Sequence, residues 1–217
     1  MPPRSRASRF KTQASSVRSA IAHLRRSDPV LSALIRQVGP FTLKPNPKRF
    51  ELLVRSIVSQ QISVSAARAI LGRLQASAKP RGVSPERLAM LDSDELRAVG
   101  LSRQKAAYLS DLAEKCATGS IRLNQMGRLT DERVIEELTQ VKGIGRWTAQ
   151  MFLIFALGRL DVFPHDDLGI RSAIRDLYGL DDLPDRATSL RIADPWRPYA
   201  TVASWYCWRS IDLRKKK

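Results

Sequence analysis

The stretch VKGIGRWTAQMFLIFALGRLDVFPHDDLGI, Val141 to Ile170, decides how this sequence folds. It opens with two glycines, Gly143 and Gly145, continues through an apolar helical segment and ends on two adjacent carboxylates. Because glycine adopts backbone angles closed to other residues, the opening predicts a tight turn between two helices. Asp166 and Asp167 lie at the end of the most apolar segment of a strongly basic chain, and this position requires an explanation.

The turn between these helices is flanked by positive charge. The second helix is expected to start at about Arg146, so its unpaired N–H groups point outward, and a helix N-terminus of this kind binds anions. Lys142 and Arg146 add charge to the site. A plain helix–helix turn is the structural alternative for Gly143 and Gly145. The basic flanks favour a turn that holds a DNA phosphate without reading bases.

Composition favours a globular protein with an anionic partner. Of the 217 residues 43% are hydrophobic, and 37 Lys and Arg against 21 Asp and Glu leave a formal charge of +16. A surplus of this size indicates nucleic acid as the partner, with an inert basic surface as the alternative. We therefore expect the protein in the cytoplasm with the nucleoid, or in the nucleus of a eukaryote.

The two cysteines, Cys116 and Cys207, exclude several kinds of site. They cannot supply the four thiolates of an iron–sulfur cluster or a cysteine-rich zinc site, and we interpret them as reduced core residues. No apolar run approaches the roughly 18 residues that a membrane span needs, so no membrane association is expected. The Arg- and Ser-rich start is interpreted as a basic arm, with an organelle transit peptide as the alternative.

Apolar residues recur at helical spacing along the chain, and alternation with a period of two is absent beyond a few residues. This pattern predicts an all-α fold of about ten helices with short loops. A proline-broken linker near 40–47 and a loop near 124–130 suggest two helical lobes with a cleft between them. The expected organisation is a basic flexible arm at 1–16 and one domain at 17–217, with lobes at roughly 48–125 and at 17–47 with 126–211.

The carboxylate pair allows a structural and a catalytic interpretation. Asp167 is a favoured N-cap for a helix predicted at 168–177, and from spacing alone this explanation is at least as strong as catalysis. A carboxylate in a DNA-binding cleft repels the phosphate backbone, however, unless its charge faces a developing cation such as the sugar formed when a glycosidic bond breaks. Asp166 would be its solvated neighbour, and His165 is expected at the surface.

At these residues the chain resembles the helix-hairpin-helix DNA glycosylase superfamily, and within it the 3-methyladenine DNA glycosylase II branch. The segments GIGRWTA, DVFPHDDLGI and WRPYATVASWY look like that branch, and SIVSQQIS and GLSRQKAAYLSDLA are similar to its other marked segments. The resemblance covers about Phe50 to Trp208.

The resemblance implies two all-α lobes, a helix-hairpin-helix DNA-binding motif and an active site between the lobes. It implies an enzyme of base excision repair that flips alkylated purines such as 3-methyladenine and 7-methylguanine from double-stranded DNA and hydrolyses the N-glycosidic bond. Such an enzyme is expected to act as a monomer on damaged DNA and to need no cofactor for catalysis. The rival interpretation is a non-catalytic hairpin protein that recognises DNA structure.

The resemblance also assigns roles to residues. It places the catalytic carboxylate at Asp167, acting by stabilising the sugar cation, by orienting water or by both, with Asp166 as the lesser candidate. It places the intercalating residue at Gln61 with Gln60 beside it, where some relatives carry leucine. The remaining assignments are a pocket of Trp147, Trp205, Met151 and Tyr206, hairpin contacts to DNA from Lys142, Gly143, Gly145 and Arg146, and a structural Na⁺ or K⁺ on the backbone carbonyls of Thr139, Val141 and Ile144.

One position separates the reaction types. Superfamily members that also cut the strand use a lysine that falls on Trp147 here, and tryptophan cannot form an imine with the sugar. The resemblance therefore implies a monofunctional enzyme that leaves an abasic site. A strand-cutting enzyme with Lys142 as the imine nucleophile is the alternative. Core packing is the alternative role for Trp147 and Trp205, and Met151 stands where some relatives have a second pocket aromatic.

Overall fold

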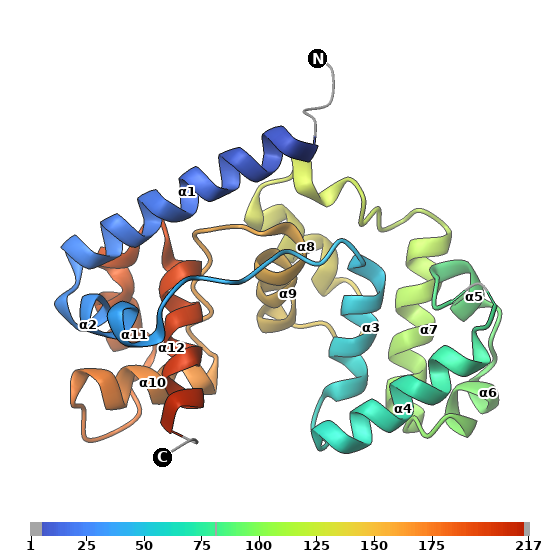
Figure 1. Ribbon diagram of the computed structural model, residues 1–217. Coiled ribbons are helices and arrows are strands. Elements are labelled where there is room, and N and C mark those ends of the chain that lie inside the picture. The colour runs from blue at the N-terminus through green and yellow to red at the C-terminus, as the bar shows by residue number, and fades with distance from the viewer. Residues whose placement is uncertain (1–5, 81, 215–217) are drawn as a thin grey trace. The chain divides into compact units, whose positions relative to one another are not determined.

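The computed structural model describes residues 6–80 and 82–214, with side chains from residue 16 onward (Figure 1). Within these residues the chain is helical and forms no strand, which confirms the all-α expectation. The twelve α-helices of the described residues slightly exceed the number expected, because several are only one or two turns long. They are α1 Arg6–Ser27, α2 Pro29–Val38, α3 Arg49–Ser59, α4 Val64–Ser77, α5 Pro85–Ala89, α6 Ser93–Ala98, α7 Arg103–Ala117, α8 Asp131–Thr139, α9 Arg146–Phe152, α10 Leu168–Tyr178, α11 Arg186–Ala193 and α12 Ala200–Arg214.

The helices form two compact units. Unit 1 combines the chain up to Lys44 with the chain from Arg159 onward, and unit 2 is Pro45–Gly158. The first boundary falls inside the proline-broken linker that the sequence pointed to. The second differs from the expected lobe boundary, because residues 126–158 belong with unit 2: α9 packs against both α3 and α8.

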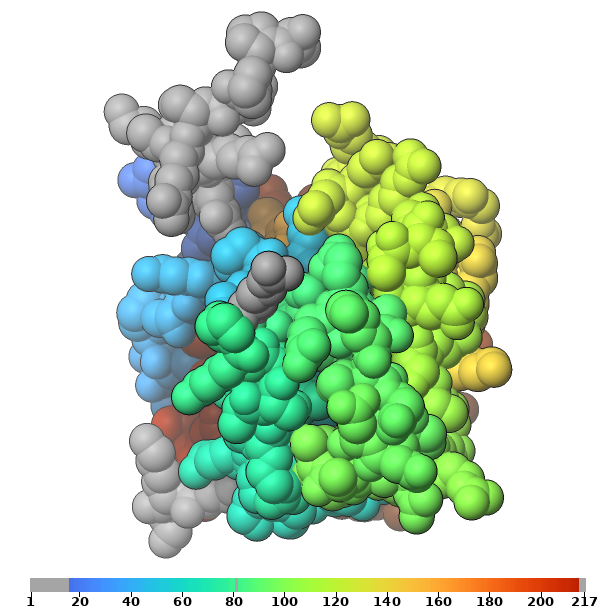
Figure 2. All heavy atoms as spheres, turned by 90° about the vertical axis from the view of Figure 1, so that its right-hand side faces the viewer, coloured from blue at the N-terminus to red at the C-terminus, as the bar shows by residue number. Residues whose placement is uncertain are grey.

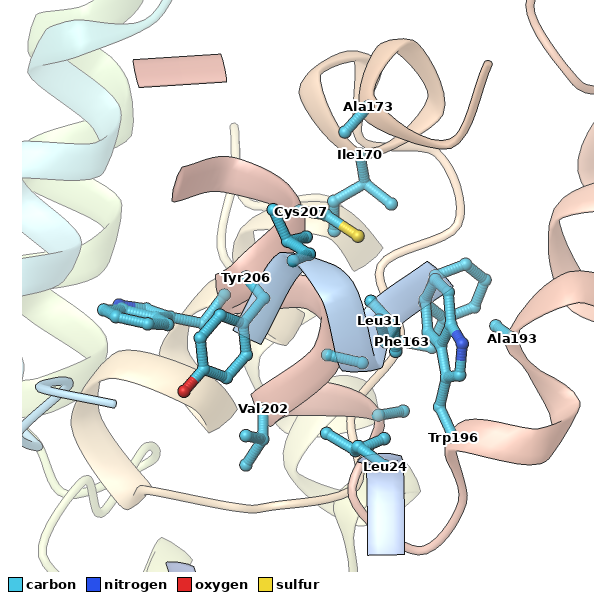
Figure 3. Close-up of a cluster of buried hydrophobic side chains, with 14 of the residues drawn as sticks. Leu24, Leu31, Phe163, Ile170, Ala173, Ala193, Trp196, Val202, Tyr206 and Cys207 are labelled. Carbon is cyan, nitrogen blue, oxygen red and sulfur yellow. The ribbon is translucent and has the colours of Figure 1, made fainter. Parts of the chain in front are cut away.

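The core of unit 1 surrounds one buried carboxylate. Asp28 is 4% exposed and caps α2, where its Oδ1 accepts a hydrogen bond from the N–H of Leu31 at 3.0 Å. Its Oδ2 accepts from the indole Nε1 of Trp196 at 2.8 Å and from the hydroxyl of Tyr178. Trp196 is fully buried and meets Phe163 edge to face, with ring centroids 5.5 Å apart (Figure 3). Because a buried carboxylate needs partners, these donors fix α2 to the C-terminal helices.

In unit 2 a short turn, residues 60–63, separates α3 from α4. α3 ends at Ser59, and Ser63 caps α4 through its hydroxyl, which accepts from the N–H of Ala66 at 3.2 Å. Between the helices Gln61 has a φ of +54°. The turn between the two helices leaves Ile62 exposed. Figure 2 shows the surface formed by α4 to α7, coloured from teal to light green.

The start of the chain differs from the expected flexible arm. Helix α1 begins at Arg6, so the backbone of residues 6–16 is helical, while residues 1–5 lie outside the described part of the chain. None of the described helices combines the length and the apolar character needed to cross a membrane.

Both cysteines are free thiols. Cys207 is fully buried in unit 1, and burial raises the pKa of its thiol to about 12. Burial likewise raises the pKa of the Cys116 thiol to about 11. Cys207 is a core residue, in accord with the interpretation from the sequence, whereas Cys116 is only partly buried.

Candidate active site and hairpin

The hairpin joins α8 to α9 through residues 140–145. The N–H of Val141 donates to the carbonyl of Leu138, and the N–H of Ile144 donates to the carbonyl of Val141, both at 3.1 Å. Helix α9 begins directly after Gly145, where no side chain caps its first turn, and it continues into a π-helical turn at Leu153–Leu157. The role of this helix start as an anion site stays a prediction.

The two hairpin glycines have different roles. Gly143 has a φ of +80°, and a Cβ at this position would lie 2.1 Å from Cδ2 of Tyr108. The ring of Tyr108 on α7 therefore packs directly on the glycine backbone. Gly145 has a φ of −93°, and a Cβ there would meet no atom within 4 Å. Only Gly143 is required by the fold of the turn.

The predicted phosphate contacts lie at the surface. Lys142 is exposed, and its backbone N–H donates to Oδ2 of Asp111 at 2.9 Å. Arg146 pairs with Glu132 at 2.7 Å in an exposed ion pair. Such a pair contributes at most about 1 kcal/mol, so a DNA phosphate can compete for Arg146. Both side chains thus remain candidates for contact with a phosphate.

The carbonyls predicted to hold a monovalent cation lie at the end of α8 and in the turn after it. Thr139 is its last residue, where carbonyls lack intrahelical partners and the helix dipole favours positive charge. The carbonyl of Val141 already accepts one hydrogen bond and keeps a second lone pair. A set of carbonyl oxygens fits a Na⁺ or K⁺ ion, and the cation site stays a prediction.

Asp167 is held by two N–H donors on one oxygen. It is the N-cap of α10, and its Oδ1 accepts from the N–H of Ile170 at 2.9 Å and from the indole Nε1 of Trp208 at 3.0 Å. The side chain is 9% exposed, so the carboxylate is nearly buried and fixed. The capping role predicted from the sequence is confirmed, and the catalytic role remains compatible with it.

The neighbours of Asp167 differ from each other. Asp166 is exposed, as expected of a solvated neighbour. The expectation of a surface histidine is wrong, because His165 is only 6% exposed. Its Nδ1 lies 2.9 Å from Oδ1 of Asp166. The fold buries the ring because the chain from Phe163 to Asp167 turns tightly ahead of α10, with the N–H of His165 donating to the carbonyl of Phe163.

Sequence reasoning missed the tryptophan that holds the carboxylate. Trp208 lies on α12, one turn beyond the Trp205 that the resemblance singled out. A Cβ on Gly169 would stand 3.1 Å from Oδ1 of Asp167 and 3.4 Å from Cδ1 of Trp208. Glycine at 169 therefore leaves room for the indole to reach the carboxylate. The glycine in DDLGI and the second tryptophan of WYCW were the only signals of this contact.

The predicted pocket residues have different environments within their units. Trp147, in the first turn of α9, is 43% exposed, so core packing is wrong for this residue. Met151, one turn later, is 7% exposed. In unit 1, Trp205 is 7% exposed and meets Phe41 edge to face at 4.9 Å. Tyr206 is fully buried, and its hydroxyl donates to the carbonyl of Gly39 at 2.9 Å. Trp205 and Tyr206 thus pack into the core, and their pocket role stays a prediction.

The turn predicted to enter DNA is tied to the hairpin. Gln61 is exposed, whereas the Nε2 of Gln60 donates to the carbonyl of Gly143 at 2.9 Å. Sequence reasoning also missed Lys105, whose ammonium group donates to the carbonyls of Val58 and Gln60. Lys105 could have been noticed because it lies in GLSRQKAAYLSDLA, a segment that is similar to the family but to which the resemblance assigned no role.

An all-helical fold with a glycine hairpin, followed by a fixed aspartate at the start of a later helix, defines the helix-hairpin-helix class of DNA repair proteins. Residues 54–198 match the HhH-GPD superfamily of base excision DNA repair proteins. The chain belongs to this superfamily.

Named relatives are similar over most of the chain. A DNA-3-methyladenine glycosylase 1 of Schizosaccharomyces pombe is 37% identical over 205 residues, which cover 91% of this chain and 89% of the relative. The solved structure of the S. pombe 3-methyladenine DNA glycosylase Mag1 in complex with abasic DNA superposes with a TM-score of 0.79 at 36% identity, covering 89% of this chain and 97% of that one. A DNA-3-methyladenine glycosidase of Bacillus halodurans gives a TM-score of 0.82 at 34% identity, with 91% of each chain covered.

The difference between the hairpin glycines can be tested by two substitutions. Gly143→Ala places a side chain in the left-handed region and against Tyr108, so we expect it to lower the free energy of unfolding by about 2–4 kcal/mol. Gly145→Ala should change it by about 1 kcal/mol or less, since nothing stands within 4 Å of its Cβ. Denaturant unfolding of both variants measures these values, and equal destabilisation would contradict the packing described here.

Proposed function

We propose that this protein is a monofunctional DNA glycosylase that releases alkylated purines such as 3-methyladenine and 7-methylguanine from duplex DNA and leaves an abasic site. The observation that carries the proposal is the fixed, nearly buried carboxylate of Asp167. It occurs in a chain 37% identical to a protein named DNA-3-methyladenine glycosylase.

Binding begins with the phosphate backbone. The formal charge of +16 favours association with DNA through release of counterions, so affinity should fall as salt rises. The amide groups at the start of α9 and the exposed Lys142 provide donors for one phosphate. A cation on the carbonyls of Thr139, Val141 and Ile144 would add positive charge beside it. These contacts hold the backbone without selecting a sequence.

Access to the damaged base requires its removal from the stack. Flipping costs a few kcal/mol and least where damage weakens pairing. The exposed side chain of Gln61 is suited to fill the vacated space. The exposed face of Trp147 offers a stacking surface, and stacking on an aromatic ring contributes roughly 1–3 kcal/mol per base. Because N-alkylated purines carry positive charge, a cation–π interaction adds about 0.5–2 kcal/mol.

The chemical step needs charge stabilisation more than acid catalysis. As the bond between C1′ and the purine nitrogen breaks, its electron pair leaves with the base, and the cationic purine departs neutral. The sugar becomes an oxocarbenium ion, which the carboxylate of Asp167 stabilises. A water molecule then adds to C1′ and gives up a proton. The N–H groups of Ile170 and Trp208 hold the carboxylate in place, so it needs no reorganisation during the reaction.

The residue types around the hairpin support base release without strand cleavage. Imine formation needs an amine, and the position that carries lysine in strand-cutting relatives is Trp147 here. The nearby amine of Lys142 belongs to an exposed side chain whose backbone is fixed by Asp111. Water is therefore the proposed nucleophile.

The proposal predicts the effect of replacing Asp167. Asp167→Asn keeps an N-cap of the same shape but removes the negative charge, so the rate of base release should fall about a hundredfold or more while DNA affinity is retained. Release of free 3-methyladenine and 7-methylguanine from methylated duplex DNA measures this rate.

Asp166→Asn is the matched control, because it removes a neighbouring charge that is exposed. It should release bases at nearly the wild-type rate. Full activity in Asp167→Asn would refute the catalytic assignment. DNA binding without any release by the wild-type protein would instead favour a non-catalytic DNA-binding protein.

Borohydride reduction distinguishes the two reaction types. During turnover on damaged DNA, a monofunctional enzyme should form no covalent adduct with the DNA, because no amine is bonded to the sugar. Trp147→Lys introduces an amine at the position of the strand-cutting relatives and serves as a positive control. An adduct with wild-type protein that disappears in Lys142→Met would show that Lys142 is the nucleophile and would overturn the monofunctional proposal.

A further inference from the structure

Lys105 joins α7 to the end of α3. Its ammonium group donates to the carbonyl of Val58 at 2.7 Å and to the carbonyl of Gln60 at 2.6 Å. Val58 lies in the last turn of α3 and Gln60 is its C-cap, at a helix end where carbonyls lack intrahelical N–H partners. Burial lowers the pKa of Lys105, in keeping with an ammonium directed into the protein. The side chain thus acts as a fixed cation at a helix C-terminus.

The segment that Lys105 holds is conformationally demanding. Gln61 has a φ of +54°, in the left-handed region that is unfavourable for residues other than glycine. Its neighbour Gln60 is anchored through both its carbonyl and its side chain, since Nε2 donates to the carbonyl of Gly143. The turn that presents Gln61 is therefore bound to α7 on one side and to the hairpin on the other.

The same helix also holds the hairpin. Tyr108, three residues after Lys105, packs on Gly143. Asp111, three residues further, accepts from the N–H of Lys142 and pairs with Lys115 at 2.6 Å. Burial raises the pKa of Asp111, but the hydrogen bonds from Lys115 and Lys142 and their positive charges together lower it below its ordinary value. Residues three apart are neighbours on a helix surface. Successive neighbours on α7 thus contact both turns.

We propose that Lys105 is a positioning residue for base extrusion. It fixes the turn that carries Gln61 relative to the hairpin. The distance between the intercalating Gln61 and the hairpin that binds the DNA backbone is thereby held constant. The proposal rests on the proposed function for its substrate. Lys105 itself touches neither base nor sugar in this account. Its effect is confined to opening the duplex, and not to breaking the glycosidic bond.

This separation of steps defines the test. Lys105→Met keeps the apolar stem and removes the donor, Lys105→Arg keeps a cation that can donate to two carbonyls, and Arg103→Met removes an exposed charge from the same helix as the matched control. Single-turnover release of 7-methylguanine is measured from a fully paired duplex and from a duplex with mismatches around the lesion. Mismatches lower the free energy needed to flip the base out of the duplex, so the intercalating Gln61 contributes less on the mismatched substrate.

Lys105→Met should lose at least tenfold in rate on the paired duplex and less than twofold on the mismatched one. Lys105→Arg should regain most of the rate, and Arg103→Met should match wild type on both. An unchanged rate on the paired duplex overturns the proposal. Equal loss on both substrates also overturns it, since that result places Lys105 in the chemical step or in overall stability, which thermal unfolding then separates.

A binding measurement keeps the inference independent of catalysis. The affinity for a duplex with a tetrahydrofuran abasic analogue is compared with the affinity for the intact duplex. We expect Lys105→Met to reduce this preference at least fivefold, while Arg103→Met leaves it unchanged. No preference in the wild-type protein, or an unchanged preference in Lys105→Met, overturns the inference. Absence of base release from any substrate would instead refute the proposed function. The ratio of the affinities for the tetrahydrofuran duplex and the intact duplex would still test the role of Lys105.

Discussion

Two N–H groups converge on a single carboxylate oxygen of Asp167, one from the backbone of Ile170 and one from the indole of Trp208. The first contact starts α10, and the second ties α10 to α12. The carboxylate of Asp167 is therefore needed at the start of α10 to hold this helix. This structural role explains why a basic chain has a carboxylate after its most apolar segment. A side chain that is already immobile costs nothing to organise when a cation develops beside it. Structure and proposed chemistry thus depend on the same oxygen.

In unit 2, side-chain donors bind backbone carbonyls that lack partners at the ends of helices. Each turn in it follows a helix end, where carbonyls have lost their partners. The ammonium of Lys105 donates hydrogen bonds to the carbonyls of Val58 and Gln60. The side-chain amide of Gln60 donates to the carbonyl of Gly143. Because these donors come from α7 and from the neighbouring turn, neither turn can shift alone. Rigid placement of exposed loop residues on helices is what a protein needs if it is to distort DNA at a defined point.

Much of this architecture could be predicted because its signals are local. Asp167 caps a helix at the position that the sequence indicated, and α9 begins at Arg146, as the glycine turn predicted. Helical periodicity and capping depend on residues three or four positions apart, so a single sequence contains them. The superfamily assignment needed ordered motifs in addition, since no local rule connects a hairpin with an aspartate after it.

The remainder depends on contacts between distant segments. Trp208 reaches Asp167 across 41 residues, and Lys105 reaches Val58 across 47. Periodicity shows which face of a helix is apolar but not which polar tip meets which acceptor. His165 was misplaced for the same reason, because its burial results from a tight turn rather than from a pattern. The unit boundary at Gly158 was missed since α9 packs on α3, whose sequence lies about a hundred residues earlier.

If the charge of Asp167 stabilises a sugar cation, as proposed, ligand binding can detect this without any base release. The affinity for a duplex with a positively charged pyrrolidine ring in place of the sugar is compared with that for a neutral tetrahydrofuran ring, in wild type and in Asp167→Asn. A group that stabilises the transition state should bind its charged analogue more tightly. The account predicts that wild type prefers the cationic ring at least tenfold and that Asp167→Asn loses this preference. An equal preference in both proteins would contradict it.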